Sequence, residues 1–310
     1  MFWLNSFTTL LPLLNTDIFV NKLLSLPQVK CRDTSLLSSK LDTIRQDEQT
    51  ELLILSDFDY TFSKAYDLHG NPLLSTIGVI DNFLPKDLST ELSNLWANCL
   101  IIETNPSMSY EEKASFMEKC WTDAHRIILS AGITKSQIKE WSLMSKIELR
   151  DGVNEIANHL LKEEIPLILF SAGVTDIVEI ILGRELGQST NHIQVISNAL
   201  KYDKTERAIG FAEPLIHCFN KNVSTIEQET FSRTKTILSR KNVLLMGDSL
   251  GDLYMGKERE KSQGVTLKIG FLNSHNNDTL IEYLNGYDIV LIDDQTMQVP
   301  GLILEFLSLQ

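Results

Sequence analysis

Six short apolar runs, separated by segments with helical periodicity, constrain the fold of this chain more than any other feature. Runs of about five consecutive apolar residues are typical of strands that are covered on both faces. The runs are LLILS (52–56), PLILF (166–170), IQVIS (193–197), NVLLM (242–246), LKIGF (267–271) and DIVLI (288–292). Between two of them, Val153, Ile156, Ala157 and Leu160 follow the spacing of a helix. The alternation predicts an α/β fold with a doubly wound parallel sheet.

The first two runs are separated by an insert of about a hundred residues, far longer than a connection inside a compact sheet. The insert carries three stretches with helix signals: Leu88, Leu92 and Leu95; then 110–129; then 136–147. We therefore expect a helical cap inserted into the core. The predicted division is an N-terminal arm (1–27), a core (28–68 and 152–310) and a helical cap (69–151).

Charged and hydroxyl-bearing residues stand in the loops that follow the predicted strands. Asp57 and Asp59 come directly after the first run, and the tripeptide 171–173 (SAG) follows the second. The GDSLGD segment 247–252, with Asp248 and Asp252, follows NVLLM, and Lys221 precedes that strand. An isolated D-x-D pattern also fits an acidic turn or a helix cap. Because ligands of open α/β sheets bind outside the carboxyl ends of the strands, these groups together predict one site.

Two carboxylate clusters, a hydroxyl and an ammonium suit phosphoryl transfer to a carboxylate. Carboxylates alone would repel a phosphate dianion, so a hard cation must lie between them. Oxygen ligands without His or Cys favour Mg²⁺. Lys221 and the Ser171 hydroxyl would then neutralise the remaining phosphate oxygens.

The order D-x-D-x-T, S-A-G, Lys and G-D-S-x-G-D resembles the haloacid-dehalogenase superfamily of phosphatases, and more closely the cytosolic 5′-nucleotidase III (pyrimidine 5′-nucleotidase) family. The stretches that carry the closer resemblance are LSDFDYTFS, LIIETNP, MEKCWTDAH, ILFSAGVTDIVEII, LIHCFNK, LMGDSLGDLYM, LKIGFLN and YDIVLIDD. Together they span most of the chain after the N-terminal arm. The resemblance implies a Mg²⁺-dependent enzyme that hydrolyses nucleoside 5′-monophosphates, either pyrimidine ones such as CMP and UMP or 7-methyl-GMP.

The same resemblance implies roles for the site residues. Asp57 would be the nucleophile that takes the phosphoryl group, Asp59 the acid and base, and Thr61 a residue that fixes the loop by hydrogen bonding. The Mg²⁺ ligands would be the Asp57 carboxylate, the Asp59 main-chain carbonyl and Asp248. The phosphate would be bound by Ser171, Ala172 and Lys221.

Asp252 would orient Lys221 or a metal-bound water, although a carboxylate favoured by a helix N-terminus is a plainer interpretation.

Two cap residues would recognise the base by the same resemblance. Glu103 of LIIETNP would accept hydrogen bonds from base N–H groups, and Trp121 stands where 7-methylguanosine phosphate-specific members carry Trp. A large indole stacks well on a cationic methylated purine. The plainer interpretations are a solvated cap residue for Glu103 and a core aromatic for Trp121. The chain departs from the family where an Arg-Phe pair is usual, because Lys64 and Ala65 stand there and Tyr66 follows.

The amino-acid composition limits which kinds of partner we expect this chain to bind. The chain carries 28 Lys and Arg against 41 Asp and Glu, a net charge of −13, which disfavours binding to a nucleic acid polymer. Its N-terminal apolar stretch has polar interruptions and no basic residue before Lys22, so we expect neither a membrane span nor a signal peptide. We expect a cytoplasmic monomer.

The chain has four cysteines: Cys31, Cys99, Cys120 and Cys218. We expect them to be reduced, because no C-x-x-C pair is present.

Two other functions stay open from the sequence. The same core would serve a haloacid-dehalogenase phosphatase that acts on another small phosphomonoester, such as a sugar phosphate or phosphoserine. A non-catalytic nucleotide-binding module is disfavoured because the reactive groups are all present together. These are Asp57, Asp59, Ser171, Lys221, Asp248 and Asp252.

Overall fold

The computed structural model describes residues 15–47, 49–103, 105, 107–190, 192–222, 225, 237–261, 264–273 and 277–308. Its helices are α1 (Thr16–Leu24), α2 (Thr34–Gln46), α3 (Thr76–Phe83), α4 (Lys86–Glu103), α5 (Tyr110–Ser130), α6 (Lys135–Met144), α7 (Val153–Lys162), α8 (Thr175–Leu186), α11 (Asn277–Gly286) and α12 (Gln298–Ser308). Its strands are β1 (Val29–Lys30), β2 (Leu52–Ser56), β3 (Leu167–Val174), β4 (Ile193–Asn198), β5 (Leu200–Tyr202), β6 (Ala208–Phe211), β7 (Asn242–Gly247), β8 (Thr266–Leu272) and β9 (Ile289–Ile292). Short 3₁₀ segments are η2 (Gln49–Glu51), η3 (Gly187–Thr190) and η4 (Leu250–Lys261).

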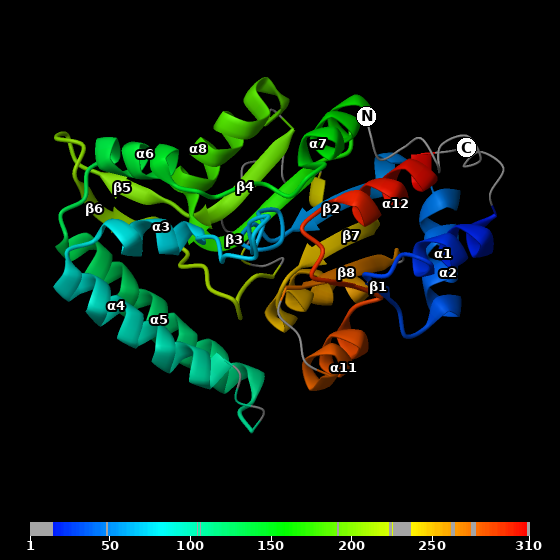
Figure 1. Cartoon of the computed structure of the whole chain (residues 1–310), viewed down its shortest axis with the longest axis horizontal. Coiled ribbons are helices and arrows are strands. Elements are labelled where there is room, and N and C mark those ends of the chain that lie inside the picture. The colour runs from blue at the N-terminus through cyan, green and yellow to red at the C-terminus, as the bar shows by residue number, and fades with distance from the viewer. Residues whose placement is uncertain are drawn as a thin grey trace.

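The central sheet has the strand order β1-β9-β8-β7-β2-β3-β4 (Figure 1). All neighbouring strands in it are parallel except β1 and β9. The six predicted strands are all present in this sheet, which confirms the predicted α/β fold with its doubly wound sheet. The sequence did not predict β1 or the separate β5–β6 hairpin, because strands of two to four residues are too short to show a periodic pattern.

Both faces of the sheet are buried, as continuous apolar strands require. Along β2, Leu52 and Ile54 face one hydrophobic cluster, which includes residues of α2, α7 and α12. Leu53 and Leu55 face a second cluster, which includes Met255 of η4 and residues of α11. Alternate side chains of one strand therefore fill two cores, and the strand ends are left to build loops.

The first described helix, α1, packs on the core. The ring of Phe19 stacks on Phe306 of α12 with 4.0 Å between centroids, and the Asn15 side chain caps the helix by accepting the Ile18 N–H at 2.9 Å. Residues 1–14 of the predicted N-terminal arm lie outside the described residues. None of the described helices has the length and apolar character needed to cross a lipid bilayer.

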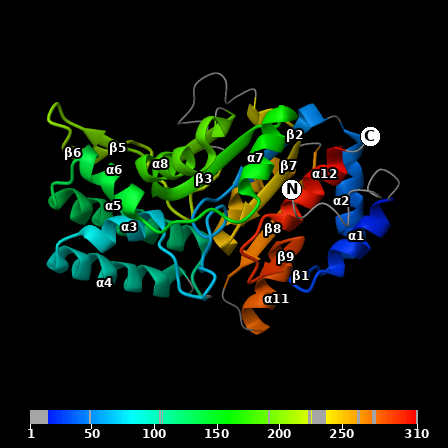
Figure 2. The same cartoon turned by 45° about the horizontal axis from the view of Figure 1, so that its top comes forward.

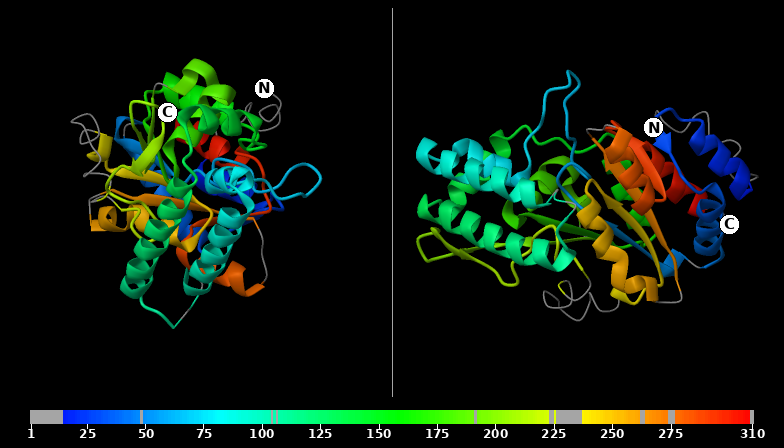
Figure 3. Two further views of the ribbon diagram at one scale, coloured as in Figure 1. Left: turned by 90° about the vertical axis from the view of Figure 1, so that its left-hand side faces the viewer. Right: turned by 90° about the horizontal axis from the view of Figure 1, so that it is seen from below.

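The insert between β2 and β3 forms helices α3 to α6. Helices α4 and α5 run side by side, at the end of the molecule opposite α1, α2 and α12 (Figures 1 and 2). The β5–β6 hairpin lies against α5 (Figure 3). There His125 stacks on Phe211 at 3.6 Å, and the Ala208 N–H donates to the Ile133 carbonyl at 2.8 Å. A segment from beyond β4 thus packs on the helices of the insert. The division into arm, core and cap stays a prediction.

The expectation of four reduced cysteines is wrong for two of them. Cys99 of α4 and Cys120 of α5 form a disulfide, with 6.4 Å between their Cα atoms, while Cys31 and Cys218 are free thiols. The two partners are 21 residues apart in sequence and share no motif. They meet because α4 and α5 pack side by side, which spacing along the chain does not reveal.

Candidate active site

The loop after β2 lies at the point where the strand order of the sheet reverses. From β2 the chain proceeds to β3 and β4 on one side, and then crosses to β7 and β8 on the other. Loops on either side of such a point diverge and leave a crevice for a ligand. The main-chain N–H of Asp57 donates to the Met246 carbonyl of β7 at 3.0 Å, which sets the first aspartate between β2 and β7 at this point of the sheet.

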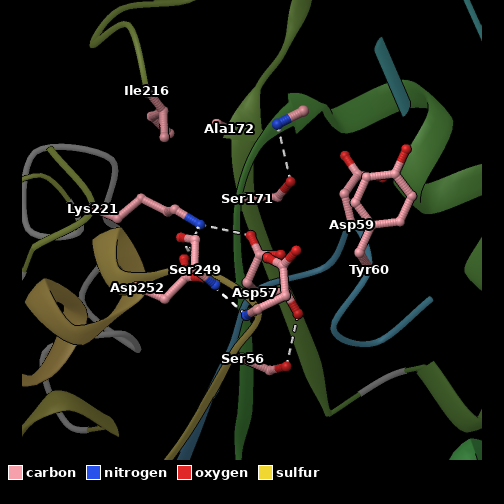
Figure 4. Close-up of polar contacts among 12 residues, drawn as sticks. Ser56, Asp57, Asp59, Tyr60, Ser171, Ala172, Ile216, Lys221, Ser249 and Asp252 are labelled. Atoms are coloured by element: carbon pink, nitrogen blue, oxygen red, sulfur yellow. Dashed lines mark hydrogen bonds and ion pairs between the residues drawn. The ribbon is translucent and has the colours of Figure 1, made fainter. Parts of the chain in front are cut away.

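Lys221 joins two of the predicted aspartates (Figure 4). Its Nζ atom lies 2.6 Å from Asp57 Oδ1 and 2.5 Å from Asp252 Oδ1, and all three side chains are buried. Burial by itself would lower the pKa of Lys221, but the charges of Asp252 and Asp57 outweigh it and raise that pKa above its ordinary value. Lys221 is therefore a fixed positive charge beside Asp57.

Both carboxylate oxygens of Asp252 accept hydrogen bonds. While Oδ1 accepts from Lys221, Oδ2 accepts from the main-chain N–H groups of Asp248 (3.1 Å) and Ser249 (3.0 Å) and from the Ser249 hydroxyl (3.0 Å). These contacts support a residue that orients Lys221 and the 248–249 loop. They favour that interpretation over a carboxylate that merely interacts with a helix N-terminus.

Three carboxylates crowd together beside the carboxyl ends of β2 and β7. One oxygen from each of Asp57, Asp248 and Asp252 lies within 4.8 Å of the others, so the group can hold a metal ion. Burial raises the pKa of Asp57 to about 7, with Lys221 opposing and Asp252 adding to the rise. Burial and the charges of Asp57 and Asp252 raise the pKa of Asp248 well above its ordinary value. One ammonium does not offset three carboxylates, and their hard oxygen donors fit Mg²⁺.

Asp59 lies apart from this cluster, on the side away from Lys221 (Figure 4). Its Oδ1 atom accepts the Thr76 main-chain N–H at 2.8 Å, and its Oδ2 atom accepts the Thr76 hydroxyl at 2.6 Å. Burial raises the pKa of Asp59 to about 6, while the hydrogen bonds from Thr76 oppose the rise. A carboxyl group with a pKa near neutrality can both give and take a proton.

The loop that carries both aspartates is held by Arg150, which the sequence did not single out. The guanidinium donates to the main-chain carbonyls of Tyr60, Thr61 and Asp294. Tyr60 sits in the left-handed region, with a φ of 62°, and its carbonyl also accepts from Asn273 Nδ2 at 2.9 Å. Nothing in the sequence distinguishes Arg150 from a surface arginine, because its partners are carbonyl groups that any residue carries.

Thr61 contacts Arg150 through its main chain rather than through its side chain. Its side chain is fully buried, but its hydroxyl has no hydrogen-bond partner among the described residues. The main-chain carbonyl of Thr61, which accepts Arg150 Nε at 2.7 Å, holds the loop instead. The role of the Thr61 hydroxyl stays a prediction.

Residues 171–173, called the SAG loop below, lie in the last part of β3 and contact α5 through Trp121. Ser171 Oγ accepts the Gly173 N–H at 2.9 Å, and the Ala172 carbonyl accepts from Trp121 Nε1 at 3.2 Å and from Asn198 Nδ2 at 2.7 Å. The Trp121 ring lies edge-on to Trp96, with 4.5 Å between centroids. Trp121 thus reaches from α5 to the last part of β3.

Glu103 ends α4 and lines a cleft of about 940 Å³, together with residues of α5, η4 and α11. Burial raises its pKa, and the charge of Asp252 adds to the rise, while a hydrogen bond from Cys218 opposes it. Its main-chain carbonyl accepts from Lys113 Nζ at 2.8 Å. Asp57 and Trp121 are not among the residues that line this cleft.

Residues 64–66, which depart from the family pattern, are held to the core by ion pairs and hydrogen bonds. Lys64 Nζ forms ion pairs with Asp151 at 2.8 Å and Glu148 at 3.3 Å. The main-chain N–H groups of Ala65 and Tyr66 donate to Gln295 Oε1 at 2.8 and 3.3 Å. Lys64 therefore contacts the segment just before α7 rather than Glu103 or Trp121.

Comparison with known proteins gives a family and close relatives. A family model described as pyrimidine 5′-nucleotidase (UMPH-1) matches residues 60–308. The putative cytosolic 5′-nucleotidase 3 of Caenorhabditis elegans is 36% identical over 298 residues, covering 94% of this chain and 78% of the relative. The 7-methylguanosine phosphate-specific 5′-nucleotidase of Homo sapiens is 33% identical, covering 91% and 93%.

Solved structures agree in fold. A crystal structure of cytosolic 5′-nucleotidase IIIB bound to cytidine matches with a TM-score of 0.79 and 28% identity, over 93% of this chain and 96% of that one. A HAD family hydrolase from Salmonella enterica matches with a TM-score of 0.52 and 13% identity, over 82% and 72%. At 13% identity, the second match shows a shared fold alone.

Proposed function

The chain belongs to the pyrimidine 5′-nucleotidase (UMPH-1) family, and on that premise we propose that it is a Mg²⁺-dependent 5′-nucleotidase that hydrolyses nucleoside 5′-monophosphates to nucleoside and phosphate. The observation that carries the proposal is the Lys221 ammonium held between Asp57 and Asp252 at the end of β2. It places a positive charge beside a carboxylate that can act as a nucleophile.

In the first step, an Asp57 carboxylate oxygen attacks phosphorus and the bond to the ribose 5′-oxygen breaks. Asp59 gives its proton to that leaving oxygen. In the second step, Asp59 takes a proton from water as the water oxygen attacks the aspartyl-phosphate, which releases phosphate and restores Asp57. Lys221, the Ser171 hydroxyl and the loop at Ala172 bind the phosphate oxygens.

The ion would be held by Asp57, Asp248 and the main-chain carbonyl of Asp59. When bound, Mg²⁺ neutralises the charge that the carboxylates and the phosphate bring together. Asp252 keeps its role in orienting Lys221, because both of its oxygens already accept from N–H or O–H donors.

Glu103 and Trp121 would recognise the base. Support comes from their position on the paired helices α4 and α5. Glu103 lies beside Cys218, and Trp121 donates a hydrogen bond to the SAG loop. The relatives' names point to two bases, since one is specific for 7-methylguanosine phosphate and another was solved with cytidine. The Caenorhabditis elegans relative is named cytosolic, which supports a cytoplasmic location.

The test is phosphate release from CMP, UMP, 7-methyl-GMP, a sugar phosphate and phosphoserine, with and without Mg²⁺. The proposal expects Mg²⁺-dependent release from the nucleotides. Preferred release from the sugar phosphate or phosphoserine would identify a different phosphatase. Release from none of them would favour a non-catalytic binding module.

The variant Asp57→Asn keeps the size of the side chain but removes the attacking charge. Its activity is expected to fall by more than about a thousandfold, whereas activity within about tenfold of the wild type would overturn the role of Asp57. Asp87→Asn, an exposed carboxylate at the start of α4, is the matched control and should leave activity unchanged.

A further inference from the structure

Asp59 receives both of its close hydrogen bonds from one residue outside its own loop. The Thr76 N–H and hydroxyl each donate to a different oxygen of the carboxylate, at 2.8 and 2.6 Å. Two donors from one residue fix both the position and the plane of the carboxylate. Each carboxylate oxygen keeps a further lone pair for another partner.

Thr76 owes this geometry to its place in the fold. It is the first residue of α3, and Ser75 caps that helix by accepting the Gly78 N–H at 3.1 Å. The first N–H groups of a helix have no partner inside the helix, so the Thr76 N–H is free to bind Asp59. The Thr76 side chain is fully buried.

The space around Thr76 depends on the SAG loop. A Cβ atom at Gly173 would lie 1.9 Å from Thr76 Oγ1 and 3.0 Å from Asp59 Oδ2. Contact this close requires a residue without a side chain. Three segments therefore meet at one carboxylate: the loop after β2, the start of α3 and the SAG loop of β3.

We propose that Thr76 is a positioning residue that holds the Asp59 carboxyl for proton transfer to the leaving oxygen, and that it thereby couples the first helix of the insert to the chemistry of the core. The inference rests on the proposed function, in which Asp59 is the acid. It adds a contact that neither the motifs nor the sequence spacing contains. Thr76 acts through Asp59, whose carboxylate oxygens accept its N–H and its hydroxyl.

The dependence on the leaving group tests this role. An alkoxide needs a proton to depart, whereas p-nitrophenolate departs without one. Thr76→Val removes the hydroxyl but keeps the side-chain shape and the main-chain N–H. We expect kcat/KM for CMP to fall by about 10- to 100-fold, and kcat/KM for p-nitrophenyl phosphate to fall by less than about threefold. Thr76→Ser, which restores a hydroxyl, should recover most of the loss.

Ser75→Ala is the matched control, because it removes the cap of α3 without removing a donor to Asp59. It should not reproduce the selective loss. Equal losses for both substrates in Thr76→Val, no recovery in Thr76→Ser, or the same pattern in Ser75→Ala would overturn the positioning role. A wild-type protein that releases phosphate from neither substrate would instead sink the proposed function, and this inference with it.

Discussion

At the scale of single residues, Arg150 holds the loop that carries Asp57 and Asp59. Its side chain is 1% exposed and donates to three main-chain carbonyls, and its guanidinium lies 4.1 Å from the centre of the Phe271 ring. Burial lowers its pKa to about 10, so it stays charged at neutral pH. A buried cation that is satisfied by carbonyl groups is costly to remove, because the Thr61 and Asp294 carbonyls then lose the donor that Arg150 supplies.

We predict that Arg150→Met lowers the free energy of unfolding by about 3–4 kcal/mol. Urea unfolding followed by circular dichroism measures the loss. Arg126→Met, at an exposed arginine of α5 with surface ion pairs to Glu91 and Asp123, should cost less than about 1 kcal/mol. Similar losses for the two variants would show that the Arg150 contacts do not hold the loop.

We propose that Trp121 discriminates between the two bases. Stacking of an indole on a cationic methylated guanine should exceed stacking on neutral cytosine by about 0.5–2 kcal/mol. We therefore predict that Trp121→Ala lowers kcat/KM for 7-methyl-GMP more than for CMP, by a few-fold to about thirtyfold, and chiefly through KM. Steady-state kinetics on both nucleotides at saturating Mg²⁺ measures the difference. Equal losses would leave Trp121 as a packing residue that joins α5 to the SAG loop.

At the scale of elements, the disulfide ties α4 to α5 close to both proposed base-recognition residues. Cys99 lies one helical turn before Glu103, and Cys120 directly precedes Trp121. A bridge of this sequence separation removes conformational freedom from the unfolded chain, and so stabilises the folded state by about 3 kcal/mol.

We predict that Cys99→Ser lowers the free energy of unfolding by up to about 3 kcal/mol when the proteins are compared without reductant. Cys31→Ser, at a free thiol, is the matched control and should change little. The difference between Cys99→Ser and the wild type should shrink once a dithiol reductant is present. A wild-type protein that unfolds at the same urea concentration with and without reductant would contradict the prediction.

The bounds of α5 show that local sequence signals can fix where a helix begins and ends. Apolar spacing predicts a helix over 110–129, and α5 runs from Tyr110 to Ser130. Its start is set by a capping box, in which Ser109 and Glu112 each bind the main chain of the other. The β5–β6 hairpin carries no comparable signal, because its strands of three and four residues are placed by packing on α5.

At the scale of the whole molecule, the acidic balance and the three crowded aspartates favour binding of a divalent cation. A ligand that binds only the folded state stabilises it, by about 2.7 kcal/mol at a hundred times its Kd. We predict that Mg²⁺ raises the Tm, that EDTA reverses the rise, and that Asp248→Asn removes most of it. Thermal unfolding measures the shift, with NaCl of equal ionic strength as the control. An equal rise with NaCl would indicate general screening of the net charge of −13 rather than a metal site.

The sequence by itself determined the six main strands, the insert and the chemical class of the site. Apolar runs and the residues directly after them are local features, and parallel strands bring those residues to one edge of the sheet. Asp57 and Asp248 could therefore be predicted together, and the order of motifs that the chain shares with the family added Lys221. Only the tertiary structure decided that Thr76 binds Asp59, that Arg150 holds the loop and that Cys99 pairs with Cys120. Such contacts join residues distant in sequence, and they depend on how whole elements pack, so they leave no periodic pattern in the chain.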